Sequence, residues 1–95
     1  MTIFWAAAAQ SDLARIYDFL AQYDLQAADS ALELLISSPE ELLDFPRRGP
    51  RLSEFDPREV REFRIGAYVM RYELAGTDLR VLRMFHVRED RYQPL

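Results

Sequence analysis

Residues 66–87 read GAYVMRYELAGTDLRVLRMFHV, and this stretch decides the fold. Apolar and polar side chains alternate along it, which is typical of strands that turn one face toward a core. Gly66 and the run at 76–78 interrupt the alternation with residues that favour tight turns. With the residues just before it, the stretch predicts an antiparallel meander of three strands, over residues 61–65, 68–74 and 79–87.

The alternation also predicts which side chains share a face of each strand. In the second strand of the meander, the side chains expected to pack on helices are Tyr68, Met70, Tyr72 and Leu74. In the third strand, the same rule separates Leu82, Met84 and His86 from Val81, Arg83 and Phe85.

In the first 46 residues, the apolar side chains recur at other spacings. Thr2–Trp5 is aromatic and β-branched, which predicts a first strand. From about Ala7 apolar residues recur three and four positions apart, as on a helix with one buried face. The predicted core stripe of this helix is Leu13, Ile16, Tyr17 and Leu20. Phe4 and Trp5 are also expected in the core.

A second helix is predicted after a tight turn, with Asp24 as its N-cap. Its core stripe is Ala28, Leu32, Leu35 and Ile36. Ser38 and Pro39 resemble a new helix start, so we expect a kink or restart there, with helix continuing to about Asp44. The predicted architecture is an α+β fold in the order β-α-α-β-β-β. It is one domain over residues 1–95, with the helical hairpin packed on one face of a small twisted antiparallel sheet.

The composition of the chain limits the functions that it can have. The chain has no cysteine, which excludes disulfides, thiolate metal sites and cysteine nucleophiles and fits a cytoplasmic protein. The apolar opening run lacks a positive leader, and no stretch is long enough to cross a membrane. Residues 1–46 carry eight acids and one base, whereas residues 47–95 carry eleven bases and eight acids. Because all 12 bases are arginine, the second half is suited to anionic surfaces that a guanidinium binds in two-pronged geometry.

Catalytic motifs are largely missing from the sequence. It contains no Gly-rich phosphate loop, zinc-binding helix or nucleophile elbow, and it has a single histidine. We therefore expect no metal and no cofactor. The densest polar cluster is the tail at 86–92, where His86 could act as an acid or base beside Arg88. Alternatively, His86 is a half-buried structural residue and the tail is a solvated cluster of ion pairs.

Three strand arginines have two possible roles. Arg61, Arg71 and Arg83 project from predicted strands, where long basic side chains are unusual. They either form cross-strand pairs with Glu62 and Glu73 or contact a partner.

Several short motifs, taken in order, point to one family. They are Trp5 in the first strand, Asp12-Leu13 and Ala27-Ala28 in the helices, Phe45-Pro46 before Arg48-Gly49, Val60-Arg61-Glu62, and the runs at 66–72 and 82–91. This set covers nearly the whole chain and resembles the ParE/RelE toxin superfamily of bacterial toxin–antitoxin systems. The run at 66–72 and the histidine-containing tail are more similar to the ParE branch.

The resemblance implies a gyrase inhibitor that acts by binding, with no catalytic residue, and that a ParD-like antitoxin neutralises. The alternative is a RelE-like, ribosome-dependent messenger endoribonuclease that uses His86 and Arg88. Val69 stands where ribosome-dependent relatives commonly have arginine, and the net charge of −4 suits ribosomal RNA poorly. A toxin that has decayed into an interaction module is a third possibility. The expected working surface is Arg71, Arg83, His86, Arg88 and Arg91. We expect no membrane partner and no sequence-specific DNA binding by this chain alone.

Overall fold

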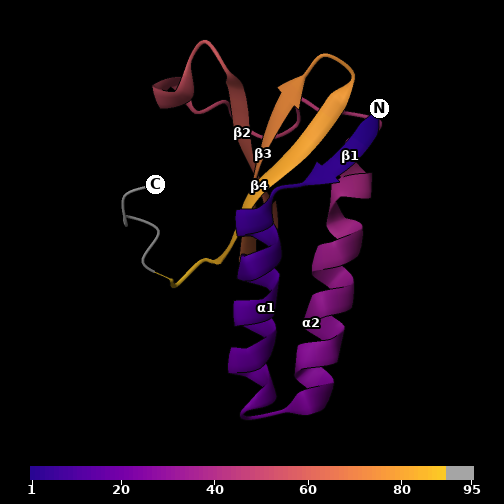
Figure 1. Ribbon diagram of the computed structural model, residues 1–95, viewed down its shortest axis with the longest axis vertical. Coiled ribbons are helices and arrows are strands. Elements are labelled where there is room, and N and C mark those ends of the chain that lie inside the picture. The colour runs from indigo at the N-terminus through magenta and orange to yellow at the C-terminus, as the bar shows by residue number, and fades with distance from the viewer. Residues whose placement is uncertain (90–95) are drawn as a thin grey trace.

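The computed structural model describes residues 1–89 and shows the predicted α+β order (Figure 1). Its elements are β1 (Thr2–Trp5), α1 (Ala7–Ala21), α2 (Leu25–Ser37), the 3₁₀ turns η1 (Ser38–Leu42) and η2 (Ser53–Phe55), β2 (Glu59–Ile65), β3 (Tyr68–Ala75) and β4 (Asp78–His86). Within these residues, no helix is long and apolar enough to cross a membrane.

The sheet has the strand order β1-β4-β3-β2. Strands β2, β3 and β4 form the antiparallel meander that the sequence predicts. β1 lies beside β4 and runs parallel to it, with Thr2 opposite Asp78, so the sheet is mixed and not wholly antiparallel. The prediction missed this because an alternating pattern specifies the faces of a strand but not its neighbour.

A β-bulge corrects the predicted faces of β4. Arg71 lies opposite Arg83, whereas the next residue, Tyr72, lies opposite Val81, so Leu82 is an extra residue in β4. Beyond a bulge the alternation changes phase. Val81 is therefore in the core with Met84, and Leu82 lies in a surface hollow on the other face, contrary to the prediction.

The helices pack side by side and extend well past the end of the sheet (Figure 1). Their buried residues join the sheet in one core, whose fully or nearly fully buried members are Ala9, Ile16, Leu35, Leu42, Ile65, Met70, Tyr72, Leu79, Val81 and Met84. Two residues predicted in the core are exposed, Phe4 at 49% and Ile36 at 51%.

The ends of α2 confirm one predicted cap and correct the other. Asp24 accepts hydrogen bonds from the backbone N–H groups of Gln26 and Ala27, at 3.0 and 3.2 Å, as an N-cap does. Ser38 is not an N-cap, because its backbone is helical and its hydroxyl donates to the carbonyl of Leu35. The helix therefore continues into a 3₁₀ turn, with Pro39 in its first turn, and does not restart.

The loop before β2 covers the far edge of the sheet. Leu52 donates to the carbonyl of Val60, and Glu62 donates to that of Pro50. A side chain at Gly49 would collide with the backbone carbonyl of Glu62, so only glycine permits this approach. This loop also carries Phe55 onto the sheet face that holds Arg71.

Candidate functional site

Asp12 of α1 completes the open edge of β4. Because β1 ends at Trp5, the end of β4 has no neighbouring strand on that side. Asp12 Oδ2 accepts hydrogen bonds from the backbone N–H of Met84 and from Arg83 Nε, both at 2.8 Å. Arg15 Nη2 donates to the carbonyl of Met84 at 3.3 Å. These two helix side chains therefore take the place of a strand.

The carboxylate of Asp12 is buried, at 3% exposure, and remains charged. Burial alone would raise its pKa, but hydrogen bonds from Arg83, from the backbone of Met84 and from Arg15 outweigh burial and hold the pKa below its ordinary value. A stable negative charge therefore neutralises Arg83, which the sequence analysis placed on the working surface.

Arg71 is buried on the sheet face opposite the helix-packed side, at 8% exposure. Its Nε and Nη2 donate to Glu62 at 3.1 and 2.8 Å, so of the two roles that the sequence left open for Arg71, the structure shows the cross-strand pair. The rings of Phe55 and Phe85 flank the guanidinium, each with its centroid 5.4 Å away. Nη1 is buried and has no hydrogen-bond partner within the described residues. The structure thus places Arg71 inside the molecule.

The other strand pairs differ from the prediction. Glu73, expected beside a strand arginine, is paired with Arg58 from the loop at 2.9 Å. Arg61 pairs with Glu59 on its own strand at 2.9 Å.

The turn after β4 is fixed by hydrogen bonds at His86 and Glu89. The backbone N–H of His86 donates to Glu89 Oε1 at 2.8 Å, and the N–H of Arg88 donates to Nδ1 of His86 at 3.1 Å. Arg15 forms an ion pair with Glu89 Oε2. The ring of His86 meets that of Tyr68 edge to face, with the centroids 5.2 Å apart. Hydrogen bonds at the backbone N–H and at Nδ1, together with the ring of Tyr68, therefore fix the orientation of His86.

Arg88 differs from Arg71 and Arg83. It is exposed, and its side chain forms no ion pair with any residue from 1 to 89. Arg91, the fifth residue of the expected surface, lies outside the described residues.

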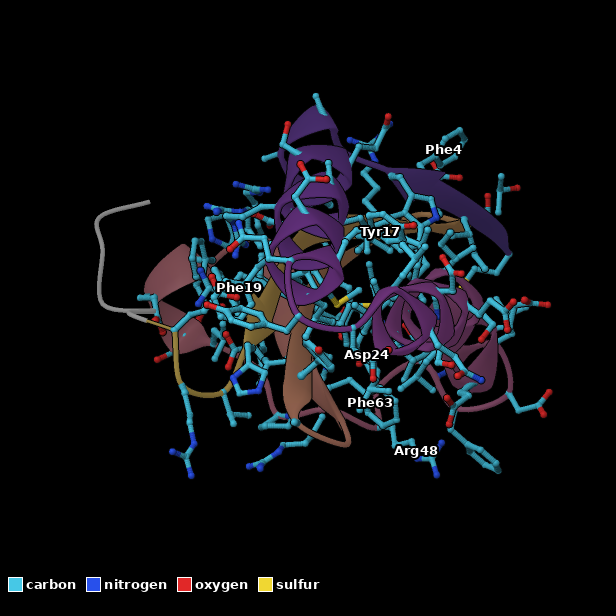
Figure 2. All side chains as sticks on the ribbon, turned by 90° about the horizontal axis from the view of Figure 1, so that it is seen from below. Phe4, Tyr17, Phe19, Asp24, Arg48 and Phe63 are labelled. Atoms are coloured by element: carbon cyan, nitrogen blue, oxygen red, sulfur yellow. The ribbon has the colours of Figure 1, made fainter. Side chains whose placement is uncertain are left out.

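An apolar groove of about 500 Å³, here called the α1 groove, lies beside this turn. Its walls are Ile16, Phe19, Leu20 and Tyr68, and its rim is Arg15, His86, Arg88 and Glu89. Phe19 lies on the side of α1 away from α2, whereas Tyr17 lies toward α2 (Figure 2). Burial, and secondarily the carboxylate of Glu89, raises the pKa of Tyr68, so its hydroxyl stays protonated at neutral pH.

Sequence reasoning missed this groove, although one signal was present. Phe19 is a large aromatic residue adjacent to the core stripe of α1 but outside it, and its side chain is 59% exposed. Asp12 and Arg15 were also missed as partners of β4, because both are polar residues off the helical stripe.

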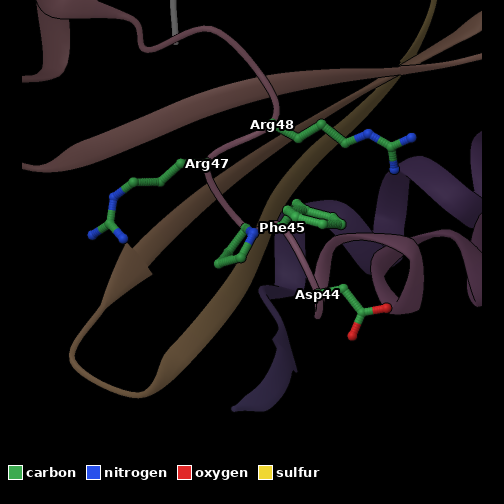
Figure 3. A pocket seen from close by; sticks show the side chains of 5 residues that line it. Asp44, Phe45, Arg47 and Arg48 are labelled. Carbon is green, nitrogen blue, oxygen red and sulfur yellow. The ribbon is translucent and has the colours of Figure 1, made fainter.

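A second, shallower hollow of about 520 Å³ lies at the loop after η1 (Figure 3). Phe45 is 69% exposed there, and Arg47 and Arg48 point away from each other. Arg47 is paired with Glu59, and Arg48 lies over the ring of Phe63. The polar groups do not converge, so this hollow lacks the arrangement of a small-molecule site.

Among residues 1–89, no three histidine or carboxylate side chains gather as metal ligands would.

Comparisons with known proteins agree with this geometry. The family model described as ParE toxin of type II toxin-antitoxin system, parDE, matches residues 3–91. Toxin RelE1 of Caulobacter vibrioides is 30% identical over 90 residues, which cover 95% of this chain and 97% of that protein. A solved chain of the chromosomal ParDE TA system from P. aeruginosa shares the fold, with a TM-score of 0.75 at 20% identity over 90% of this chain and 95% of that one. The chain therefore belongs to the ParE toxin family of type II toxin–antitoxin systems.

Proposed function

We propose that this toxin inhibits DNA gyrase in the cytoplasm by binding it, without breaking a covalent bond, and that a ParD-like antitoxin neutralises it. The target surface includes Arg88 and the groove rim around His86. Arg71 and Arg83 support that surface from within the sheet, and Arg91 follows it along the chain.

The observation that carries the proposal is the neutralisation of the strand arginines. Glu62 holds Arg71, and Asp12 holds Arg83, through hydrogen bonds of 2.8 to 3.1 Å. An enzyme that docks on ribosomal RNA needs uncompensated cations to bind phosphates. Carboxylates of the same chain compensate the charge of these two arginines, and residues 1–46 carry a net charge of −7. This charge distribution supports a protein target better than RNA.

The endoribonuclease reading has one observation in its favour. His86 and Arg88 lie together on the rim of the α1 groove, where an imidazole and a guanidinium could act on a phosphodiester. Nδ1 of His86 already accepts a hydrogen bond from the backbone of Arg88, so only Nε2 is left for proton transfer. The 30% identical relative bears the name RelE1, which keeps this alternative worth testing.

The target is tested with purified toxin in two reactions. We expect inhibition of gyrase supercoiling or accumulation of cleaved DNA, and no messenger cleavage in a reconstituted translation reaction. Arg88→Ala should lose the gyrase effect, and the matched control Arg64→Ala should keep it, because Arg64 lies on β2 and, among residues 1–89, donates only to the nearby carbonyl of Gly66. Messenger cleavage in ribosomes with gyrase unaffected would establish the endoribonuclease instead.

The antitoxin part rests on exposed apolar surface. The large hydrophobic side chains exposed in residues 1–89 are Met1, Phe4, Phe19, Tyr23, Leu25, Leu34, Ile36, Leu43 and Phe45. Exposed apolar surface of this kind marks interaction sites.

A partner that binds only the folded chain raises its stability by mass action, by about 2.7 kcal/mol at a hundred times the Kd. Co-expression with the antitoxin should therefore raise the yield and the melting temperature. Superimposable melting curves with and without the antitoxin would contradict this part of the proposal.

A further inference from the structure

We infer that the outer edge of β1 binds a second copy of this chain, whose own β1 pairs with it antiparallel and joins the two sheets into one. The inference concerns self-association of the toxin and depends neither on the proposed target nor on the antitoxin.

The outer edge of β1 differs from the other open parts of the sheet. Backbone hydrogen bonds of the loop at 50–52 cover the edge of β2, and Asp12 and Arg15 cover the end of β4. β1 is the last strand on the other side of the sheet (Figure 1), and within residues 1–89 it pairs only with β4. An edge of this kind presents backbone N–H and C=O groups that a further strand can bind.

The backbone groups that face outward belong to Ile3 and Trp5. Thr2 and Ala6 donate their N–H groups toward β4, at 3.0 and 2.9 Å. Successive residues of a strand direct their backbone groups to opposite sides, so those of Ile3 and Trp5 point away from β4. The carbonyl of Trp5 accepts a hydrogen bond from Gln10 Nε2 at 3.2 Å, and a carbonyl oxygen can accept a second one.

β1 also lacks the features that usually protect an edge strand. Edge strands in natural proteins commonly carry lysine, proline, inward-pointing charges or a bulge. The four residues Thr2–Trp5 are uncharged, β-branched or aromatic, and their pairing with β4 is regular. The side chain of Phe4 is 49% exposed. These properties favour pairing with another strand.

The charges around Phe4 permit the approach of an identical copy. Two arginines and two acids line the hollow that contains Phe4. Arg58 pairs with Glu73 at 2.9 Å, and Arg80 lies 3.8 Å from Asp78. This surface is therefore close to neutral, although the whole chain has a net charge of −4. Two copies can meet here without the repulsion that their acidic helices would cause, and a nucleic acid would find little attraction.

One register uses all the outward-facing groups of β1. When Phe4 lies opposite Phe4 of the second copy, Ile3 of each copy faces Trp5 of the other, and each such pair exchanges two backbone hydrogen bonds. The two Phe4 residues then form a non-hydrogen-bonded pair, with Cα atoms about 4.5 Å apart and the rings in cross-strand contact. Because the strand is complementary to itself in this way, we assign the edge to a second copy.

The antiparallel arrangement keeps both proposed target surfaces accessible. β4 runs parallel to β1, so the β4 strands of the two copies run in opposite directions. Arg88 of one copy and Arg88 of the other therefore lie at opposite ends of the joined sheet. The dimer presents the proposed target surface twice.

The contact is short, so the dimer should be weak. β1 has four residues, whereas a stable specific interface has about 20–30 residues on each side. We expect a monomer–dimer equilibrium that depends on concentration.

Sedimentation velocity of the purified toxin, from micromolar to millimolar concentration, measures this equilibrium. Phe4→Lys and Phe4→Glu should each weaken dimerisation about tenfold or more, because like charges then face each other across the two-fold axis. An equimolar mixture of the two variants should dimerise again, because lysine then faces glutamate. The control is Phe45→Lys, which changes an exposed phenylalanine in the loop after η1 and should dimerise as the wild type does. Melting curves show whether each variant is folded.

The register is tested with single cysteines, because the chain has none of its own. Cα atoms about 4.5 Å apart can be joined by a disulfide, so Phe4→Cys should form a linked dimer under mild oxidation. Thr2→Cys is the matched control on the same strand. In the inferred register Thr2 faces Ala6 of the second copy, so Thr2→Cys should link several-fold more slowly.

Three results would overturn the inference. The first is a toxin that stays monomeric over the whole concentration range. The second is a dimer that Phe4→Lys and Phe4→Glu leave intact, since it would use another surface. The third is equal disulfide formation by Phe4→Cys and Thr2→Cys, because random collisions or a different register would then account for the linked product.

Discussion

Arg71 and Arg83 on the sheet differ from Arg88 at its end in what surrounds each guanidinium. Glu62 and two aromatic rings enclose Arg71, and the buried carboxylate of Asp12 holds Arg83. Among residues 1–89, Arg88 has neither, although the sequence predicted all three arginines on one working surface. The difference teaches that arginines expected on one surface can differ in whether the fold itself compensates their charge. We therefore expect changes in the first region to affect stability and changes in the second to affect activity.

The largest expected effect is at Asp12. Asp12→Ala leaves Arg83 without its partner and the backbone N–H of Met84 without an acceptor. Breaking a buried ion pair by removing one member costs about 3–5 kcal/mol, and we expect the free energy of unfolding to fall by about this amount. Chemical denaturation measures it. The exposed Asp18 on the same helix is the control, because Asp18→Ala should stay within about 0.5 kcal/mol of wild type.

Arg71→Ala should have a somewhat smaller effect on stability. The change removes charge-assisted hydrogen bonds and the contacts with Phe55 and Phe85, and we expect a loss of about 2–3 kcal/mol. Arg64→Ala, on the exposed surface of β2, should cost less than about 0.5 kcal/mol. Equal melting temperatures for the two variants would show that Arg71 is not part of the structural region.

The pH dependence of the free energy of unfolding should depend on the ion pair of Asp12 in this same region. The pKa of Asp12 is lower in the folded chain than its ordinary value of 3.8. A lowered folded pKa adds stability above the unfolded value and withdraws it as the pH falls through the folded value. The free energy of unfolding should thus be steady near neutral pH and fall once the pH drops toward and below 3.8. Asp12→Asn should make this fall smaller. Part of the fall should remain, because hydrogen bonds from Arg47 lower the pKa of Glu59 and hydrogen bonds from Arg58 lower the pKa of Glu73.

The smallest expected effect on stability is at Arg88. An exposed arginine that forms no ion pair with residues 1–89 contributes little to the folding of this part of the chain, so Arg88→Ala should change the free energy of unfolding by less than about 0.5 kcal/mol. Growth inhibition, measured by induced expression, should nevertheless be lost. Arg91→Ala is expected to behave in the same way. Full toxicity of the double variant, with unchanged melting, would remove the tail from the functional surface.

The pattern of the chain predicted most of the fold because secondary structure depends on local geometry. The strands of the meander, the Asp24 cap and the two helices follow from spacings of two to four residues, and the structure confirms them. The pairing of Arg71 with Glu62 was within reach as well, since these residues face each other on adjacent strands of one hairpin. The predicted faces of β4 were wrong at Val81 and Leu82, because a bulge in β4 depends on its pairing with β3 and leaves no mark in the alternation.

The sequence by itself determined the element order, the meander, the acidic and basic halves and the family resemblance. Only the tertiary structure decided that β1 lies parallel to β4, that Asp12 neutralises Arg83 across 71 positions of the chain, and that Phe19 and Tyr68 enclose a groove beside Arg88. The physical reason is that the spacing of apolar residues along the chain shows whether a residue is buried, but not which residues it is buried against. An ion pair or a groove depends on which particular side chains meet, and that is set by how the helical hairpin is placed against the end of the sheet.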